Sequence, residues 1–251
     1  MTFTNENIWI IGCSSGIGEA LARELSTQGA TLILSARRAE ELTNLNNELG
    51  GKHHVMPLDV SDNDAMVSTV EKISSTVKTL DRVIFLAALY RPNDVRKMDV
   101  DFAKKLIDVN IMGVIYTTYA TLPLFDKQKK GQLVLCGSVA GYTGLPGGQP
   151  YSASKAAIIN LAESLYAEAE DYVDIKLISP GFVRTRITDK NQFHMPMRIE
   201  PPQAAQAIAK GLKASAFEIH FPKRFTMMTK LLKLFPYSLT LFITSKMKGK
   251  A

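Results

Sequence analysis

Cysteine and histidine are scarce in this sequence. The only cysteines among its 251 residues are Cys13 and Cys136. Two cysteines cannot form a disulfide framework and are typical of a reducing compartment, where we expect them to be inert free thiols. The four histidines lack the His-x₃-His or Cys-x₂-Cys spacing of a metal site; they are His53, His54, His194 and His220. We therefore expect no metal, and we interpret His194 as a loop residue.

Long apolar runs are also absent. No stretch of about 18 uninterrupted apolar residues occurs, which excludes a bilayer-spanning helix. The amino-terminal segment has no basic residue ahead of its short apolar run, unlike a secretory signal peptide. With 46% hydrophobic and 22% charged residues, the composition is that of an ordinary globular protein. These features predict a cytoplasmic protein with a single core.

The net charge of +6 comes from one end of the chain. Between Ile219 and Ala251 there are seven basic residues and no acidic ones, which leaves 23 basic against 24 acidic residues elsewhere. A nucleic-acid-binding surface is normally spread over a folded motif. Because no such motif is present, we expect no nucleic-acid partner.

Strand and helix patterns alternate along the chain, which is typical of βαβ units. Seven apolar runs predict strands at residues 8–11, 31–35, 54–58, 82–88, 132–136, 174–178 and 217–221. Helical periodicity fills the intervals, with long helices at about 99–125 and 151–170. Right-handed crossovers then give an α/β, three-layer, doubly wound (Rossmann) fold over residues 1–221. Its seven-stranded sheet is mostly parallel, with helices on both faces.

A glycine-rich turn, Gly12-Cys13-Ser14-Ser15-Gly16-Ile17-Gly18, joins the first strand to the first helix. Such a turn lets the backbone approach a pyrophosphate, and the helix N-terminus supplies free N–H groups and a positive dipole end. The turn also matches the G-x-S-x-G elbow of hydrolases, with Ser14 as the nucleophile. That alternative is disfavoured because only eleven residues precede Gly12 and because an elbow has no use for Gly18.

The second strand is followed by Ala36, Arg37 and Arg38. An acidic residue here accepts hydrogen bonds from a ribose 2′-hydroxyl, whereas arginine holds a 2′-phosphate. The sequence therefore predicts NADP(H) in preference to NAD(H). The alternative, two solvated arginines at a helix start, is less favourable because cations oppose the dipole there.

Three side chains form a candidate acid–base group. Tyr151 and Lys155 are four residues apart at the start of a helix, so both lie on one face. A nearby ammonium group lowers the pKa of a phenol. Ser138 follows the fifth strand, at the sheet edge where doubly wound folds bind ligands.

Together these motifs resemble the short-chain dehydrogenase/reductase family, in the single-domain branch whose length this chain shares. The resemblance covers Asn7 to Phe221. The matching motifs, in order, are Gly12…Gly16-x-Gly18, Leu58-Asp59-Val60, Asn110, Gly137-Ser138, Tyr151-x₃-Lys155 and Ser179-Pro180-Gly181.

The resemblance implies catalytic roles for four residues. Tyr151 is the general acid in reduction and the base in oxidation, and Ser138 positions the substrate oxygen. Lys155 lowers the pKa of Tyr151 and contacts the nicotinamide ribose. Asn110 distorts its helix and holds a water that links Lys155 to solvent.

The resemblance also implies a cofactor site. Asp59 contacts the adenine amino group with Val60 beside it, and the segment from Pro180 to Thr185 holds the nicotinamide carboxamide. The predicted cofactor residues are Gly12, Ser14, Ser15, Gly16, Ile17, Gly18, Arg37, Arg38, Asp59, Val60, Ala87, Ala88, Tyr151, Lys155, Pro180, Gly181, Val183 and Thr185.

One segment departs from the family. Phe85-Leu86-Ala87-Ala88 stands where the family usually has Asn-Asn-Ala-Gly. We expect Phe85 and Leu86 to replace polar contacts with packing, and the main chain of Ala87 and Ala88 to serve the cofactor.

The sequence therefore predicts an NADP(H)-dependent oxidoreductase acting on an apolar carbonyl/secondary alcohol pair, as a homodimer or homotetramer by family habit. The alternative is a catalytically idle dinucleotide-binding sensor or scaffold, which would have no use for the Ser138, Tyr151 and Lys155 set.

Residues 222–251 are predicted to form a basic, apolar C-terminal extension. An amphipathic helix is expected at Phe225–Phe235, ended by Pro236. The favoured interpretation is a flap over the substrate pocket or a subunit interface. The alternatives are a peripheral membrane contact and a contribution to a pocket for a long lipophilic substrate.

Overall fold

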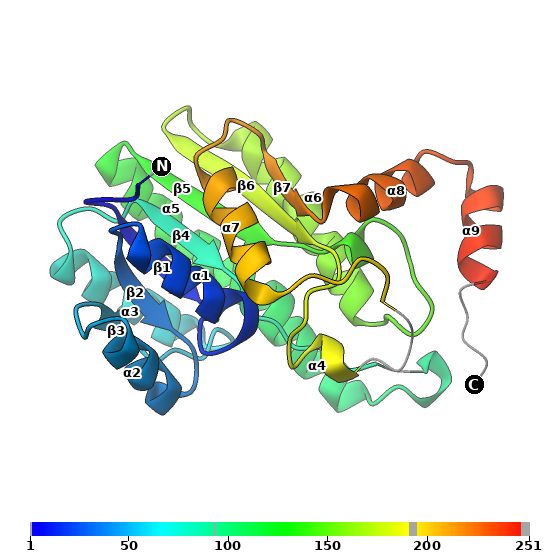
Figure 1. Ribbon diagram of the computed structural model, residues 1–251, viewed down its shortest axis with the longest axis horizontal. Helices are drawn as coiled ribbons and strands as arrows, with labels where there is room; N and C mark the ends of the chain where they lie inside the picture. Colours follow the sequence, from blue (N-terminus) through cyan, green and yellow to red (C-terminus); the bar gives the residue numbers. More distant parts are fainter. Residues whose placement is uncertain (1, 93, 191–194, 247–251) are drawn as a thin grey trace.

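The computed structural model describes residues 2–92, 94–190 and 195–246, so His194 lies outside the described residues. Seven strands form one sheet in the order β3-β2-β1-β4-β5-β6-β7, and every neighbouring pair is parallel. The strands are β1 (Asn7–Ile11), β2 (Thr31–Ser35), β3 (His54–Val55), β4 (Arg82–Phe85), β5 (Gly131–Cys136), β6 (Val173–Pro180) and β7 (Glu218–Phe221). The predicted doubly wound α/β fold is confirmed, with a sheet that is wholly parallel in its described strands (Figure 1).

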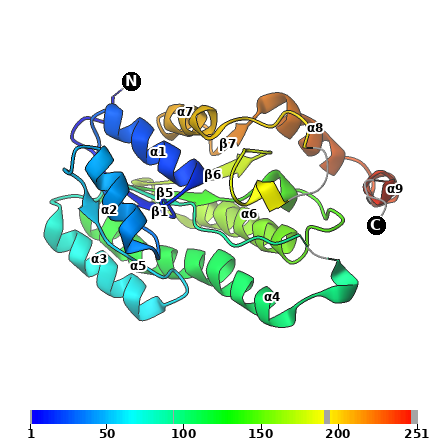
Figure 2. The same cartoon turned by 60° about the horizontal axis from the view of Figure 1, so that its bottom comes forward.

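Helices cover both faces of the sheet (Figure 2). One layer contains α1 (Gly16–Thr27), α2 (Ala39–Glu48) and α7 (Pro201–Leu212). The opposite layer contains α3 (Asn63–Thr76), α5 (Gly113–Gln128) and α6 (Tyr151–Glu168). Residues alternate between the two cores along each strand, since successive side chains point to opposite faces. In β1, Ile8 and Ile10 pack under the first layer, while Trp9 and Ile11 pack under the second.

The central strands diverge at a topological switch point. The chain leaves β1 toward one layer and β4 toward the other, which opens a crevice at the carboxyl ends of these strands. Gly12 lies at this point with a φ of +95°, and a Cβ there would be 2.5 Å from the backbone nitrogen of Ala87. The two segments that border the crevice are therefore in direct backbone contact.

Besides shifts of one or two residues at other element ends, three predicted elements differ from the structure. The fourth strand was expected to reach Ala88 but ends at Phe85, because the next residues turn away to border the crevice. The third strand was expected at residues 54–58 and contains only His54–Val55. The helix expected at about 99–125 is α4 (Val100–Ile107) followed by a π-helical turn, η2 (Asp108–Met112), and then α5.

The chain after β7 continues into two more helices. These are α8 (Lys223–Lys233) and α9 (Tyr237–Lys246), and Pro236 lies between them as the sequence predicts. Figure 1 shows α8 running away from the sheet and α9 lying beyond the rest of the fold. The proposed division between residues 221 and 222 coincides with the end of β7.

Candidate active site

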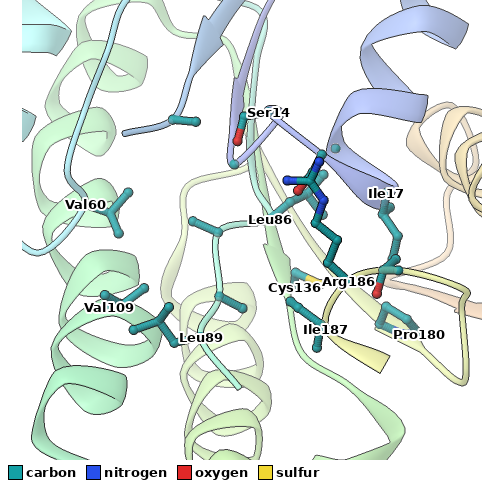
Figure 3. Close-up of a pocket in the computed structure, with 18 of the residues that line it drawn as sticks. Ser14, Ile17, Val60, Leu86, Leu89, Val109, Cys136, Pro180, Arg186 and Ile187 are labelled. Atoms are coloured by element: carbon teal, nitrogen blue, oxygen red, sulfur yellow. The ribbon is translucent and has the colours of Figure 1, made fainter. Parts of the chain in front are cut away.

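A pocket of about 400 Å³ lies at the carboxyl ends of the central strands (Figure 3). Every residue predicted to bind the cofactor lines this pocket, and Ser138 lines it too. Asn110 does not line it, although its neighbour Val109 does. The sequence motifs, which lie far apart along the chain, thus converge on one cavity.

The glycine turn fits a bound pyrophosphate. A Cβ on Gly18 would lie 2.2 Å from the carbonyl oxygen of Gly12, and one on Gly16 would lie 3.1 Å from Cγ2 of Thr185. Ser15 is the N-cap of α1, and its side chain makes no capping hydrogen bond. The first backbone N–H groups of α1 therefore need another acceptor, and a phosphate oxygen in the pocket can be that acceptor.

Basic side chains lie beside the turn, at the end of β2. The Nη2 of Arg38 donates a hydrogen bond to Oγ of Ser14 at 3.2 Å, and its Nη1 is 2.7 Å from Oε1 of Glu41. Arginine cannot accept a proton, so Ser14 has no general base in this contact and the hydrolase alternative gains no support. The pKa of Asp59 lies below its usual value. Burial alone would raise it, but hydrogen bonds from Ser61 and the charge of Arg37 together lower it by more.

The three predicted catalytic side chains meet at the other end of the pocket. Ser138 is the N-cap of the short helix η3 (Val139–Gly141), and its Oγ accepts a hydrogen bond from the N–H of Ala140 at 3.1 Å. Tyr151 is the first residue of α6. The Nζ of Lys155 lies 5.6 Å from the centroid of the Tyr151 ring and donates to the carbonyl oxygen of Cys136 at 2.7 Å.

The titration behaviour of the pair differs from the sequence expectation. Burial raises the pKa of Tyr151, and a hydrogen bond with Ser138 lowers it only in part. Burial lowers the pKa of Lys155, which is 2% exposed. We expected Lys155 to lower the pKa of the phenol, but in the protein alone Lys155 does not contribute to the shift and desolvation sets its direction. Tyr151 is therefore protonated at neutral pH.

Asn110 connects two walls of the pocket. It is fully buried in η2, where its Oδ1 accepts from the N–H of Leu89 at 2.7 Å and its Nδ2 donates to the carbonyl of Leu89 at 3.0 Å. Nδ2 also donates to Oγ of Ser154 at 3.1 Å. The predicted distortion of the helix is present as the π-helical turn. The water that would link Lys155 to solvent stays a prediction.

The segment that departs from the family pattern packs as expected. Phe85 is 1% exposed in one core, and Leu86 packs against the other. The N–H of Leu86 donates to the carbonyl oxygen of Ile11 at 2.8 Å, so the backbone keeps its place beside β1. Ala87 and Ala88 line the pocket.

Two side chains at the site were not predicted. Figure 3 shows Arg186 extending from the loop after β6 toward the glycine turn, between Ser14 and Ile17. Arg186 makes no hydrogen bond or ion pair with another described residue. The ring of Tyr90 meets the ring of Tyr151 edge to face, with centroids 4.9 Å apart. Arg186 could have been predicted, because it is a basic residue directly after the predicted cofactor residue Thr185. Nothing in the sequence indicated a role for Tyr90.

The remaining reactive side chains are buried. Burial raises the pKa of Cys13 to about 12 and also raises that of Cys136, so both stay as thiols at neutral pH. Over residues 2–92, 94–190 and 195–246, no three His, Cys, Asp or Glu side chains are grouped as a metal site requires.

Comparisons with known proteins agree with this geometry. The model of the short chain dehydrogenase family matches residues 6–195. An uncharacterised oxidoreductase of Myxococcus xanthus (strain DK1622) is 31% identical over 231 residues, covering 90% of this chain and 91% of that protein. A short-chain dehydrogenase/reductase from Burkholderia phymatum, in complex with NAD, has a TM-score of 0.83 at 20% identity and covers 92% of this chain and 94% of its own. A short-chain dehydrogenase from Burkholderia cenocepacia J2315, in complex with NADP, has a TM-score of 0.84 at 22% identity. The match covers 97% of this chain and 99% of that one.

Proposed function

The chain belongs to the short-chain dehydrogenase/reductase family of NAD(P)-dependent oxidoreductases, and we propose that it transfers hydride between NADP(H) and an apolar carbonyl/secondary alcohol pair. The observation that carries this proposal is the placement of Ser138, Tyr151 and Lys155 at one end of the pocket that holds the glycine turn. When bound, the nicotinamide supplies or accepts the hydride.

In the reduction direction, Ser138 and Tyr151 hold the substrate carbonyl oxygen. Oγ of Ser138 donates one hydrogen bond, and the phenol of Tyr151 donates the other. As the carbonyl carbon gains hydride, the proton of the phenol passes to the oxygen, so the product is a neutral alcohol. A phenol carries its proton at neutral pH, so Tyr151 is in the form that this direction requires.

Lys155 acts on the phenolate that is left. Its Nζ is 5.6 Å from the ring centroid in a buried setting, where an ammonium group stabilises the developing negative charge. Asn110 is a positioning residue, because it fixes α6 and the Leu89 segment relative to each other.

Basic side chains support the preference for NADP(H). Arg38 lies against Ser14, and Arg37 lies close enough to influence the pKa of Asp59. A 2′-phosphate beside them would be held by charge-assisted hydrogen bonds. We assign Arg186 to the pyrophosphate, since its guanidinium extends toward the glycine turn and pairs with none of the described residues.

Aromatic rings near the pocket support an apolar substrate. The ring of Tyr90 lies against that of Tyr151, and a second pair, Phe182 and Phe225, lies next to the pocket residue Gly181 with ring centroids 5.2 Å apart. A homodimer or homotetramer through α5 and α6 is supported by the exposed Tyr119 and Tyr166 on these helices. Light scattering after size-exclusion chromatography measures that state.

The test is NADPH oxidation with a panel of apolar ketones and aldehydes. We expect turnover with at least one class, and Tyr151→Phe, which keeps the ring and removes the proton donor, should abolish it. A protein that binds NADPH but oxidises none of it with any substrate would favour the idle sensor or scaffold. Labelling of Ser14 by a fluorophosphonate would instead favour the hydrolase.

A further inference from the structure

The first C-terminal helix, α8, packs Phe225 against Phe182 on the protein but turns most of its other large apolar side chains toward solvent. Its inward face carries Thr226, whose Oγ1 lies 2.6 Å from Nδ1 of His220, and Lys230, which pairs with Glu218. Its outward face carries Met227, Met228, Leu231 and Leu234, which are 55–79% exposed. These four positions form one stripe at helical spacing. A helix that only covered the protein would point this stripe inward.

The second helix, α9, also turns large apolar side chains toward solvent. Its buried residues are Thr240 and Thr244, and Oγ1 of Thr240 donates to the carbonyl oxygen of Leu232 at 3.0 Å. Tyr237, Leu241 and Phe242 are 59–85% exposed. Thr240 attaches the helix to the preceding segment, while Tyr237, Leu241 and Phe242 are largely exposed.

Exposed apolar side chains are concentrated in this part of the chain. Of the fifteen exposed large hydrophobic residues over residues 2–92, 94–190 and 195–246, nine lie between positions 227 and 242. They are Met227, Met228, Leu231, Leu234, Phe235, Tyr237, Leu239, Leu241 and Phe242. We call these nine residues the apolar tail surface. A cluster of exposed apolar side chains this large is typical of an interaction site.

The charge around the apolar tail surface has one sign. Lys223, Arg224, Lys233 and Lys246 are exposed on the same two helices, and no acidic residue occurs from Ile219 to Ala251. The acidic partner of Lys230 lies outside this segment, on β7. A partner that covers this surface must therefore combine apolar groups with negative charge.

These observations favour a lipid surface over a second copy of the chain. In a two-fold dimer the same patch meets itself, so two basic segments without acidic residues would face each other. An anionic membrane supplies acyl chains for the apolar side chains and phosphates for the lysines and the arginine. None of the described helices is both long and apolar enough to cross a bilayer. A helix with one apolar stripe, as α8 has, lies in the interface instead.

We propose that α8 and α9 dock the protein on an anionic lipid surface. The apolar tail surface enters the boundary between headgroups and acyl chains, and Lys223, Arg224 and Lys246 contact the headgroup phosphates. The inward faces of both helices stay on the protein. This assignment is independent of the substrate and of the cofactor preference.

Cosedimentation of the full chain with lipid vesicles tests the proposal. One set of vesicles is phosphatidylcholine alone, and the other contains phosphatidylglycerol as well. We expect binding to the anionic vesicles to be at least about tenfold tighter and to weaken as salt rises. Lys246→Ala and Arg224→Ala should each weaken it about fivefold, the effect of removing one basic residue near the surface.

Apolar variants test the other half of the proposal. The double variant Leu231→Ser with Phe242→Ser should lose at least about tenfold in vesicle binding. The matched controls, Val95→Ser and Lys97→Ala, change an exposed apolar and an exposed basic residue outside the tail and should bind as the parent does. Unchanged NADPH affinity and thermal midpoint show that each variant is folded.

Three results would overturn the assignment. The first is equal binding to neutral and anionic vesicles, and the second is no binding to either. The third is a dimer in solution that Leu231→Ser dissociates while vesicle binding is absent, which would assign the apolar tail surface to a second copy of the chain.

Discussion

The position of Arg38 predicts how the protein distinguishes NADPH from NADH. Its guanidinium contacts Ser14 on one side and Glu41 on the other, next to the pocket corner expected to hold the 2′-phosphate. A hydrogen bond to a charged group contributes about 1.5–3 kcal/mol. The Arg38 side chain is 47% exposed, so screening by water reduces this to about 1–2 kcal/mol. Arg38→Ala should therefore weaken NADPH binding about 5- to 30-fold.

Calorimetric titration of both cofactors measures this effect. NADH lacks the 2′-phosphate, so we expect its dissociation constant to change less than about twofold. Removing Arg38 also leaves the carboxylate of Glu41 without its partner, and that carboxylate repels a phosphate. The double variant Arg38→Ala with Glu41→Ala should then bind NADPH more tightly than Arg38→Ala alone.

Arg186→Ala is the control variant for Arg38→Ala. Arg186→Ala should weaken NADH and NADPH to the same extent, because the pyrophosphate is common to both. If Arg38→Ala also weakened the two cofactors equally, the assignment of the 2′-phosphate to this corner would be refuted.

Three further predictions concern catalysis and stability. Tyr151→Phe should lower kcat for carbonyl reduction by about a thousandfold or more while the NADPH dissociation constant changes less than twofold, which stopped-flow and binding assays separate. Asn110→Ala leaves both backbone groups of Leu89 without their partner, so urea unfolding should show a loss of about 3 kcal/mol. His53 accepts from the N–H of Leu32, and burial lowers its pKa to about 4. The unfolded chain therefore binds more protons between about pH 6.5 and 4, and stability should fall by about 2 kcal/mol as the pH is lowered through this range. His54→Gln should keep this dependence, and His53→Gln should remove it.

The order of strands and helices could be predicted because it depends on local patterns. Second-strand residues 31–35 were placed correctly because they form a short apolar run between a glycine stop and a polar segment. The end of the fourth strand was placed three residues too late. Leu86, Ala87 and Ala88 are apolar for a different reason, which is that they border the cofactor pocket and contact the glycine turn.

Site residues could be predicted where a local motif requires a particular backbone conformation. They were missed where the side chain reaches the site from a loop distant in sequence. Gly12 and Gly18 have no room for a Cβ and Gly16 has a φ of +62°, and these requirements are visible in the sequence. The contact of Tyr90 with Tyr151 and the placement of Arg186 in the pocket depend on the paths of their loops. The raised pKa of Tyr151 was also missed, since burial of the phenol depends on the packed structure.

The π-helical turn η2 (Asp108–Met112) determines how the protein would respond to the deletion of a residue in this helix. A π-helical turn holds one residue more than the regular helix around it, and each added residue rotates the rest of the helix by about 100°. Deleting one residue here would give an unbroken α-helix with a full ladder of hydrogen bonds. The same deletion would turn Asn110 away from Leu89 and separate the two walls that it joins. Shortening this helix would therefore gain one backbone hydrogen bond but lose the bonds of Asn110 to Leu89, which contribute more, so selection for stability would not favour the deletion.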